Sequence, residues 1–323
     1  MKKELILGID GGGTKTTCIL FDSQGMIIDS IQQEGSNIYV FKEKGVATIM
    51  QSISHILQKN KLNYLDVNAY GIGLAGISDL NYKEVLIKEF DRNHITKRTL
   101  FLSDAEAAFR VLCPTNIGIL VNIGTGIICF ARDSKCKMYK TAGRGYDKGD
   151  KGSGYWLGKK LLSKFLINEA IIMHDDELLQ IFDLIRKKFN CEDIKEIYKI
   201  LEDKDQLFKN IASLGEITID LAESGNDIAL AIVQEGTRHA SDYIIDIVHR
   251  MGIKDKKILL SVNGSIIENN FYRKLLEDSL MFDFHEVKWL TSVLSPAYGA
   301  GLISANYNGI NIALNNLVDK LKN

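Results

Sequence analysis

Residues 8–17, GIDGGGTKTT, place three consecutive glycines between two stretches that have the pattern of β-strands. The apolar run ELILGI predicts a buried strand, and TTCILFD predicts a second strand because it alternates and is rich in β-branched residues. One interpretation is a tight hairpin in which glycine supplies positive φ angles. Three glycines exceed what a two-residue turn requires, however, and close approach of an anion to bare backbone N–H groups explains the excess. The stretch therefore predicts a phosphate-binding β-hairpin.

Two other phosphate loops do not fit this stretch. A Walker loop requires GxxxxGK[ST] followed at once by a helix, and the dinucleotide fingerprint GxGxxG also opens a helix. Here Thr16 takes the third glycine position and a strand follows Lys15. Lys15 could neutralise phosphate charge as a point cation, although a solvated hairpin lysine is an equally good interpretation. Asp10, at the end of the first strand, could hold Mg²⁺ through water.

The same pattern recurs roughly 110 residues later, which indicates an internal repeat. An apolar strand over Ile117–Ile123 meets the turn Gly124, Thr125 and Gly126, and a second strand covers Ile127–Arg132. Each pair is followed by a third predicted strand, so each copy is a β-meander. We expect two related lobes whose glycine hairpins clamp a polyphosphate across a cleft.

The rest of the first half contains helices and two further strands. Apolar residues at helical spacing predict helices over 42–59 and 80–90. VNAYGIGLAG is a strand that runs into a glycine loop, and TLFLS is a strand that runs into a helix opening at Asp104. An aspartate at that position is either an ordinary helix N-cap or a functional carboxylate at the carboxyl end of a strand.

The second half is mostly helical from 152 to 251, and a strand–helix–strand–helix series follows it. The last helix carries Pro296 in its first turn, where proline is well tolerated. Pro114 marks a break between the halves. We expect lobes of residues 1–115 and 116–308, with the tail of residues 309–323 as a helix packed on the first lobe.

Composition narrows the classes of function. The chain has 323 residues, of which 46% are hydrophobic, so it can bury a sizeable core. The net charge is -1 and no basic block marks a surface for nucleic acid or anionic lipid. No apolar run is long enough for a membrane span or a secretory signal. The five cysteines are scattered without a CxxC pair, which favours a reducing cytoplasm.

Five motifs, in this order along the chain, resemble the sugar-kinase/Hsp70/actin superfamily: DGGGTKT, LSDAEAAF, NIGTGI, GDKGSGYWLG and SPAYGA. Within it they are similar to the N-acetylglucosamine kinase branch, which is grouped with the BadF/BadG/BcrA/BcrD ATPases. The resemblance extends from Gly8 to about Ala305. It implies an α/β, two-lobed actin-like ATPase (ribonuclease H-like) fold, with a mixed sheet in each lobe that contains a three-stranded meander flanked by helices.

The resemblance also implies an activity. The chain would be a sugar kinase that transfers the γ-phosphoryl group of ATP, with Mg²⁺, to a hydroxyl of an amino sugar. N-acetylglucosamine, N-acetylmuramic acid and then glucosamine are the candidate acceptors. Closure of the lobes on the sugar would exclude water. A cytoplasmic homodimer that serves carbohydrate metabolism and cell-wall recycling is expected.

Residue roles follow from the matched motifs. Asp104 resembles the catalytic carboxylate, which accepts the proton of the sugar hydroxyl as a general base. The ATP phosphates would be bound by Gly11, Gly12, Gly13, Thr14, Lys15, Gly124, Thr125 and Gly126, and adenosine by Asn263, Gly264 and Ser265. The sugar would be bound by Asn37, Gly76, Asp104, Arg144 and Asp150. Asn37 is otherwise a loop residue that tolerates a left-handed backbone.

Several positions depart from the family pattern. Arg144 and Ile128 stand where tryptophan and asparagine are usual, and Lys151 replaces a glutamate after Asp150. An arginine can pair bidentately with a carboxylate, and the lactyl group of N-acetylmuramic acid carries one. Our hypothesis is that Arg144 helps to admit that sugar. The alternative is a solvated surface arginine.

Other functions fit fewer residues. An ATP-driven activator of 2-hydroxyacyl-CoA dehydratases would need cysteine thiolates for an iron–sulfur cluster at a dimer interface, and Cys129 and Cys136 are the candidates. The alternative is that both are buried or idle thiols. A non-catalytic sugar sensor is a third possibility. Residues 174–177, HDDE, suggest a helix start more than a metal site.

Overall fold

The computed structural model describes residues 3–113, 117–145, 149–167, 169–202, 207–291 and 294–312. The described chain forms two compact units. Unit 1 contains the residues up to Ile117 together with those from Thr291 onward, and unit 2 runs from Gly118 to Leu290. Pro114 and residues 313–323, which carry the predicted break and most of the predicted tail helix, lie outside the described residues.

Unit 1 is built on a five-stranded mixed sheet with the order β3-β2-β1-β4-β5. Its strands are β1 (Leu5–Gly11), β2 (Lys15–Asp22), β3 (Ile27–Glu34), β4 (Ala69–Leu74) and β5 (Thr99–Ser103). The first three form the predicted antiparallel meander, and β4 and β5 extend the sheet in parallel with β1. The carboxyl ends of β1, β4 and β5 therefore meet at one edge of the sheet.

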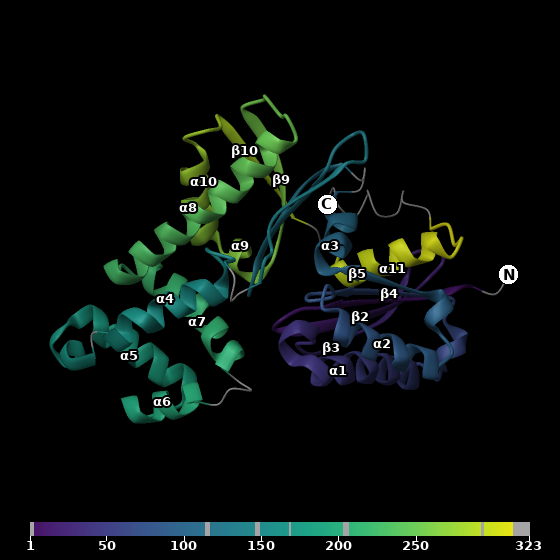
Figure 1. Cartoon of the computed structure of the whole chain (residues 1–323), viewed down its shortest axis with the longest axis horizontal. Coiled ribbons are helices and arrows are strands. Elements are labelled where there is room, and N and C mark those ends of the chain that lie inside the picture. The colour runs from purple at the N-terminus through teal and green to yellow at the C-terminus, as the bar shows by residue number, and fades with distance from the viewer. Residues whose placement is uncertain are drawn as a thin grey trace. The chain divides into compact units, whose positions relative to one another are not determined.

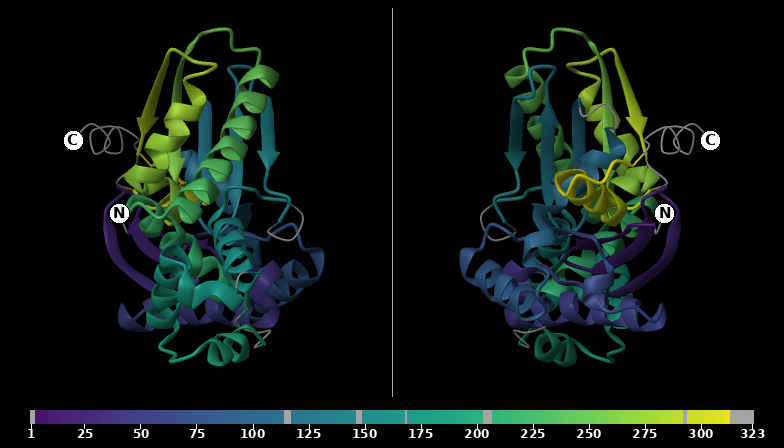
Figure 2. Two further views of the ribbon diagram at one scale, coloured as in Figure 1. Left: turned by 90° about the vertical axis from the view of Figure 1, so that its left-hand side faces the viewer. Right: turned by 90° about the vertical axis from the view of Figure 1, so that its right-hand side faces the viewer.

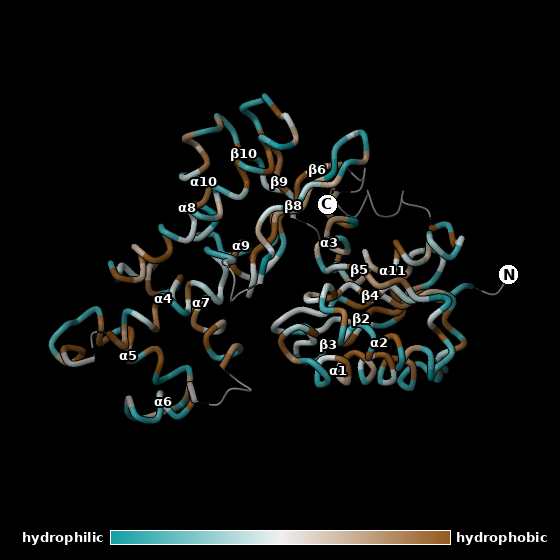
Figure 3. The backbone as a smooth tube through the Cα atoms, viewed as in Figure 1, coloured by the Kyte–Doolittle hydropathy of each residue, from teal (hydrophilic) through white to brown (hydrophobic). Residues whose placement is uncertain are grey.

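Helices cover both faces of this sheet. They are α1 (Ile38–Lys59), α2 (Leu80–Arg92), α3 (Asp104–Leu112) and α11 (Pro296–Tyr307), with short 3₁₀ turns at Tyr64–Asp66 and Thr96–Arg98. Figure 1 shows α1 and α2 on one side of the strands and α3 with α11 on the other. Figure 3 shows hydrophobic residues concentrated along the strands and hydrophilic ones on the outward turns of α1 and α2.

The position of α11 corrects one prediction, because this helix was assigned to the second lobe, 116–308. In the structure it packs on β1, β4 and α3 of unit 1. The contact is backbone against backbone: a Cβ on Gly8 would lie 1.9 Å from the Ala297 carbonyl oxygen, and one on Gly71 would lie 2.0 Å from that of Ala300. Only glycine fits such an approach, so these residues place α11 on the first sheet.

Unit 2 repeats the sheet of unit 1, with the order β10-β9-β6-β7-β8. Its strands are β6 (Gly118–Ile123), β7 (Ile127–Arg132), β8 (Met138–Ala142), β9 (Lys257–Asn263) and β10 (Glu286–Leu290). The antiparallel meander β6-β7-β8 again continues into two strands parallel to its first strand. The two sheets share strand order and direction, which confirms the predicted duplication and the α/β fold class.

The helices of unit 2 form most of its mass. They are α4 (Gly154–Ile167), α5 (Asp176–Phe189), α6 (Ile194–Glu202), α7 (Leu207–Glu223), α8 (Asp227–Arg250), α9 (Ser265–Glu268) and α10 (Asn270–Leu280), with a 3₁₀ segment at Glu169–His174. Figure 2 shows the green α8 and yellow-green α10 lying along one face of the second sheet. Within the described ranges, no helix is both long and apolar enough to cross a membrane.

Candidate active site

The first glycine hairpin joins β1 to β2 through a short turn. The Gly12 N–H donates to the Lys15 carbonyl at 3.0 Å, and neither Gly11 nor Gly12 has a φ in the left-handed region. A supply of positive φ angles therefore does not explain these two glycines. A Cβ on Gly11 would lie 2.3 Å from Ser36 Oγ, so Gly11 is required by packing. A Cβ on Gly12 would meet nothing closer than 3.5 Å, so glycine there leaves the backbone bare for a ligand.

Two carboxylates and an ammonium group meet at the carboxyl edge of the first sheet. Asp10 lies near the end of β1, and Asp104 is the first residue of α3, directly after β5. Burial raises the pKa of Asp10, the negative charge of Asp104 raises it too, Lys15 partly offsets both, and the resulting pKa is about 7. The charges of Asp104 and Lys15 therefore both act on the Asp10 carboxyl, as expected in a site that binds phosphate and a cation.

The start of α3 is capped by its neighbours and not by Asp104. Ser103 is the N-cap: its Oγ accepts from the Glu106 N–H at 3.2 Å, and Glu106 Oε2 accepts from the Ser103 N–H at 2.9 Å. The interpretation of Asp104 as an ordinary N-cap is therefore wrong. The sequence did contain the signal, because S-x-x-E in LSDAEAAF is the pattern of a capping box. Asp104 occupies the first turn, where the helix dipole favours a carboxylate.

Asn37 and Gly76, both predicted to bind sugar, lie against each other. Asn37 is the N-cap of α1, and its Oδ1 accepts from the Tyr39 N–H at 3.0 Å. Asn37 lies in the loop before α1, but its φ of -56° shows that its backbone is not left-handed. Gly76 has a φ of +80°, and a Cβ there would lie 2.5 Å from Asn37 Oδ1. The loop after β4 thus reaches Asn37 only because residue 76 is glycine.

The donor set of unit 1 fits Mg²⁺ bound together with a nucleotide. Mg²⁺ is usually held by one or two carboxylates plus substrate phosphates. Asp10 supplies such a carboxylate, and a cation beside it would favour its ionised form. In the part of the chain that the structure describes, no group of three or more His, Cys, Asp or Glu side chains could hold a metal ion. In the HDDE stretch, Asp175 caps α5 by accepting from the Glu177 and Leu178 N–H groups.

The second hairpin, in unit 2, rests on the N-terminus of α4. The Gly154 N–H donates to the Gly124 carbonyl at 2.8 Å, and the Tyr155 N–H donates to the Thr125 carbonyl at 3.1 Å. A Cβ on Gly124 would meet nothing closer than 3.8 Å, and one on Gly126 nothing closer than 3.5 Å. As at Gly12, a Cβ would be in ordinary van der Waals contact, so packing within the chain does not require glycine, and close approach of a phosphate to the backbone would explain it.

The predicted adenosine loop lies directly beside this hairpin. Gly264 has a φ of +110°, and a Cβ there would lie 2.5 Å from the Ile123 carbonyl oxygen. Asn263 Nδ2 donates to Asn122 Oδ1 at 3.0 Å, which ties the ends of β9 and β6 together. Ser265 then opens α9. The structure therefore brings Asn263, Gly264 and Ser265 into contact with the second hairpin, within one unit.

Asp150 is buried and holds the loop that carries Arg144. Its Oδ1 accepts from the Arg144 N–H at 2.9 Å, and the N–H groups of Gly143, Gly145 and Ile127 also face it. Burial nevertheless raises the pKa of Asp150 above its usual range. The Arg144 side chain is exposed. The contact of either side chain with a sugar remains a prediction.

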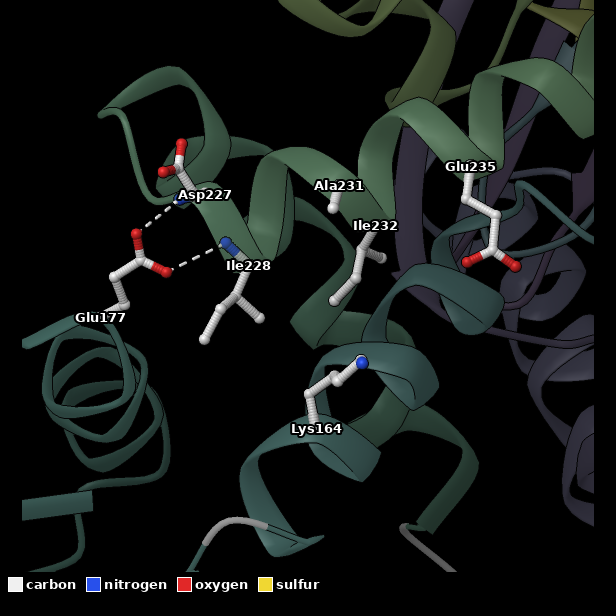
Figure 4. Close-up of a pocket in the computed structure, with 7 residues that line it drawn as sticks. All are labelled: Lys164, Glu177, Asp227, Ile228, Ala231, Ile232 and Glu235. Carbon is white, nitrogen blue, oxygen red and sulfur yellow. Dashed lines mark hydrogen bonds between the residues drawn. The ribbon is translucent and has the colours of Figure 1, made fainter. Parts of the chain in front are cut away.

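A separate open cavity of about 450 Å³ lies between α4, α5 and α8 (Figure 4). Ile228, Ala231 and Ile232 form its apolar wall, and Glu177 Oε1 and Oε2 accept from the first N–H groups of α8 at 3.1 and 3.2 Å. Its α4 residue, Lys164, is ten residues beyond Gly154, or about 15 Å along the helix. The Lys164 end of the cavity is therefore distant from the second hairpin.

The two candidate cluster ligands occupy different environments. Cys129 lies in β7 with no exposed surface, and burial raises the pKa of its thiol. Cys136 is exposed in the following turn. A thiol buried in a sheet cannot ligate a cluster shared with a second subunit. Cys129 and Cys136 therefore do not provide the pair of ligands that the iron–sulfur interpretation requires.

Comparison with known proteins places the chain among sugar kinases. The sequence model of the BadF/BadG/BcrA/BcrD ATPase family matches residues 7–304. The N-acetyl-D-glucosamine kinase of Dictyostelium discoideum is 24% identical over 319 residues, which cover 95% of this chain and 99% of that protein. The N-acetylmuramic acid/N-acetylglucosamine kinase of Clostridium acetobutylicum is 26% identical over 306 residues, which cover 93% and 97%.

A solved structure shows the same fold. A Chromobacterium violaceum protein assigned as an N-acetylglucosamine kinase superposes with a TM-score of 0.74 at 18% identity, with 93% of this chain and 99% of that chain covered. At that level of identity the likeness establishes the architecture. It confirms the two-lobed sugar-kinase fold that the motifs implied.

Proposed function

The chain belongs to the BadF/BadG/BcrA/BcrD ATPase family, and from this premise we propose that it is an ATP-dependent kinase of amino sugars. The relatives named above act on N-acetylglucosamine or N-acetylmuramic acid, and each aligns over nearly the whole of both chains. The observation that carries the proposal is the meeting of Asp10, Lys15 and Asp104 beside the bare backbone of Gly12. Such a group suits transfer of a phosphoryl group better than binding alone.

Asp104 is proposed as the general base. As the acceptor oxygen bonds to the γ-phosphorus and the bond to the ADP oxygen breaks, the hydroxyl proton passes to the Asp104 carboxylate. Asn37 and the loop at Gly76 orient the sugar so that this hydroxyl lies within hydrogen-bond reach of Asp104. Orientation of this kind supplies much of the rate enhancement in phosphoryl transfer.

The residues that the matched motifs assign to ATP are proposed to neutralise its charge. The hairpin N–H groups and Thr14, Thr125 and Lys15 are proposed to bind the phosphates, and Asn263 to Ser265 the adenosine. Asp10 would hold Mg²⁺, and Mg²⁺ would supply charge neutralisation at the phosphate oxygens. Gly12, Gly124 and Gly126 support this proposal, since packing within the chain does not require glycine at any of the three.

The acceptor is proposed to be N-acetylglucosamine or N-acetylmuramic acid, with glucosamine next. The exposed Arg144 supports a substrate with a carboxylate, because a guanidinium binds carboxylates bidentately. Asp150 is proposed to contact the sugar in addition to holding the Arg144 backbone. We also propose a cytoplasmic homodimer that serves the recycling of cell-wall amino sugars.

A coupled assay of ADP release tests the function. The purified chain is given ATP and Mg²⁺ with N-acetylglucosamine, N-acetylmuramic acid, glucosamine or glucose. We expect ADP release with at least one of the amino sugars to exceed that with glucose by about tenfold or more, since a site built for an amide rejects an analogue that lacks it. Equal release with all four sugars, or release that needs no sugar, would contradict the proposal.

A further inference from the structure

Behind the first hairpin lies a buried pair of hydroxyl groups that the proposed chemistry does not use. Thr16 and Ser36 both have no exposed surface. Their hydroxyls are hydrogen-bonded to each other at 2.7 Å, and Thr16 Oγ1 also donates to the Glu34 carbonyl at 2.6 Å. The pair therefore ties the start of β2, directly after the hairpin, to the segment that leaves β3.

That segment, Gly35–Asn37, also holds the hairpin through its backbone. The Ser36 and Asn37 N–H groups both donate to the Gly12 carbonyl at 3.0 Å. A Cβ on Gly35 would lie 2.4 Å from the Gly13 carbonyl oxygen, so the two stretches touch along their backbones. The orientation of the Gly12 peptide is thus set by the same residue, Asn37, whose side chain lies beside Gly76.

The helical turn that follows the segment ends at a strained residue. Lys42 interrupts α1 with a φ of 52° and a ψ of -128°, a conformation that L-residues rarely adopt. The single turn from Ile38 to Phe41 is therefore separate from the long part of α1. It is attached at one end to Asn37 and the hairpin and at the other to a strained residue.

We propose that Thr16 and Ser36 are positioning residues that couple the acceptor segment Gly35–Asn37 to the phosphate hairpin. On the proposed function, which this inference presupposes, a sugar bound at Asn37 fixes the N–H groups that orient Gly12. Sugar then tightens the binding of ATP, and by linkage ATP tightens the binding of sugar by the same factor. The Thr16–Ser36 hydroxyl pair transmits this effect because it fixes the position of the segment Gly35–Asn37 relative to the start of β2.

Titration calorimetry measures the coupling directly. A non-hydrolysable ATP analogue with Mg²⁺ is titrated into the full chain with and without saturating N-acetylglucosamine. We expect the sugar to lower the Kd of the analogue by about fivefold or more in the wild type, within the usual range of coupling between two sites. In Thr16→Val and Ser36→Ala the effect falls to less than about twofold.

Two variants serve as matched controls. Thr16→Ser keeps the hydroxyl and is expected to keep the coupling, which separates the hydrogen bond from packing. Ser52→Ala removes another fully buried serine hydroxyl of the same unit, one that donates only to the Thr48 carbonyl inside α1, and is expected to keep the coupling. Thermal melts of all four variants verify that each is folded.

Unchanged coupling in folded Thr16→Val and Ser36→Ala would overturn the inference, as would a wild type that binds both ligands independently. Either result leaves the proposed function intact. If the wild type bound neither the analogue nor any of the amino sugars, the proposed function would fail and the inference with it.

Discussion

At the scale of single residues, Asp10 has a strongly raised pKa within the candidate site. Its carboxyl is desolvated next to a second carboxyl, so its ionised form is disfavoured in the absence of a cation, and its pKa is about 7. Asp104 has a different environment, at the first turn of a capped helix. Two carboxylates with different surroundings are suited to different tasks, which agrees with Asp10 beside a cation and Asp104 as a base.

The raised pKa of Asp10 makes a prediction about stability. A carboxyl whose pKa rises from 3.8 on folding to about 7 binds more protons in the folded state, so stability is lost as pH rises through this window. Asn cannot ionise, so Asp10→Asn is expected to melt at a higher temperature than the wild type at pH 8, in EDTA and without nucleotide. The difference should shrink as the pH falls to 5. Thermal melts at both pH values, with an equal difference at each, would contradict this account.

For single residues, the sequence predicts which side chains belong to the candidate site better than it predicts what each of them does. The strand–helix junction locates Asp104, and the glycine cluster locates Gly12. Whether Asp104 or Ser103 caps the helix depends on which of two adjacent oxygens reaches the N–H of Glu106, although S-x-x-E gives a hint. The Thr16–Ser36 pair has no sequence pattern, because it joins residues twenty positions apart that meet only when β2 and β3 pair.

At the scale of elements, two glycines of the first hairpin have different roles. Packing within the chain requires Gly11, whereas Gly12 is explained by a bound ligand. We expect Gly12→Ala to fold normally, because its Cβ would be 3.5 Å from the nearest atom, but to bind an ATP analogue on the order of tenfold more weakly. Gly11→Ala, whose Cβ would lie 2.3 Å from Ser36 Oγ, is expected to lose stability as well. Calorimetry with thermal melts checks both, and normal ATP binding by folded Gly12→Ala would refute the role of the bare backbone.

The interruption of α1 gives a second prediction for an element. Strain at a residue with positive φ costs about 1–3 kcal/mol, and glycine removes it, so Lys42→Gly is expected to stabilise the protein by about 1 kcal/mol. Lys44→Gly, two residues later in the regular helix, is the matched control and should destabilise by a similar amount. Urea unfolding measures both free energies. Loss of stability in Lys42→Gly equal to that in Lys44→Gly would show that residue 42 is unstrained.

At the scale of the whole molecule, unit 1 is made of two separate parts of the chain, with unit 2 between them in the sequence. The sequence predicts the duplication well, since each meander is marked by local alternation and by glycines. The assignment of α11 could not be predicted, because the approach of Gly8 to Ala297 and of Gly71 to Ala300 involves residues that carry no local pattern. Small residues in a strand predict close packing, but they do not identify the partner.

The composition of the two units predicts which fragments of the chain fold by themselves. Residues 118–290 are contiguous and form one unit, so this fragment is expected to melt cooperatively by itself. Residues 1–117 lack α11, which covers β1 and β4, and are expected not to fold alone. Joining residues 1–117 to residues 291–323 through a flexible linker should restore cooperative melting. Circular dichroism of the three fragments tests this, and cooperative melting of 1–117 alone would contradict the placement of α11.

The most direct test of the central claim is the phosphorylated product itself. Phosphorus NMR is recorded on ATP, Mg²⁺ and N-acetylglucosamine or N-acetylmuramic acid with the wild type, with Asp104→Asn and with the control Asp175→Asn, which alters the N-cap of α5. We predict a sugar phosphate ester with the wild type and the control, formed about 10²–10⁴-fold more slowly by folded Asp104→Asn, because Asn cannot accept the proton. An ester formed equally fast by Asp104→Asn would contradict the assigned base, and no ester with either sugar would contradict the account as a whole.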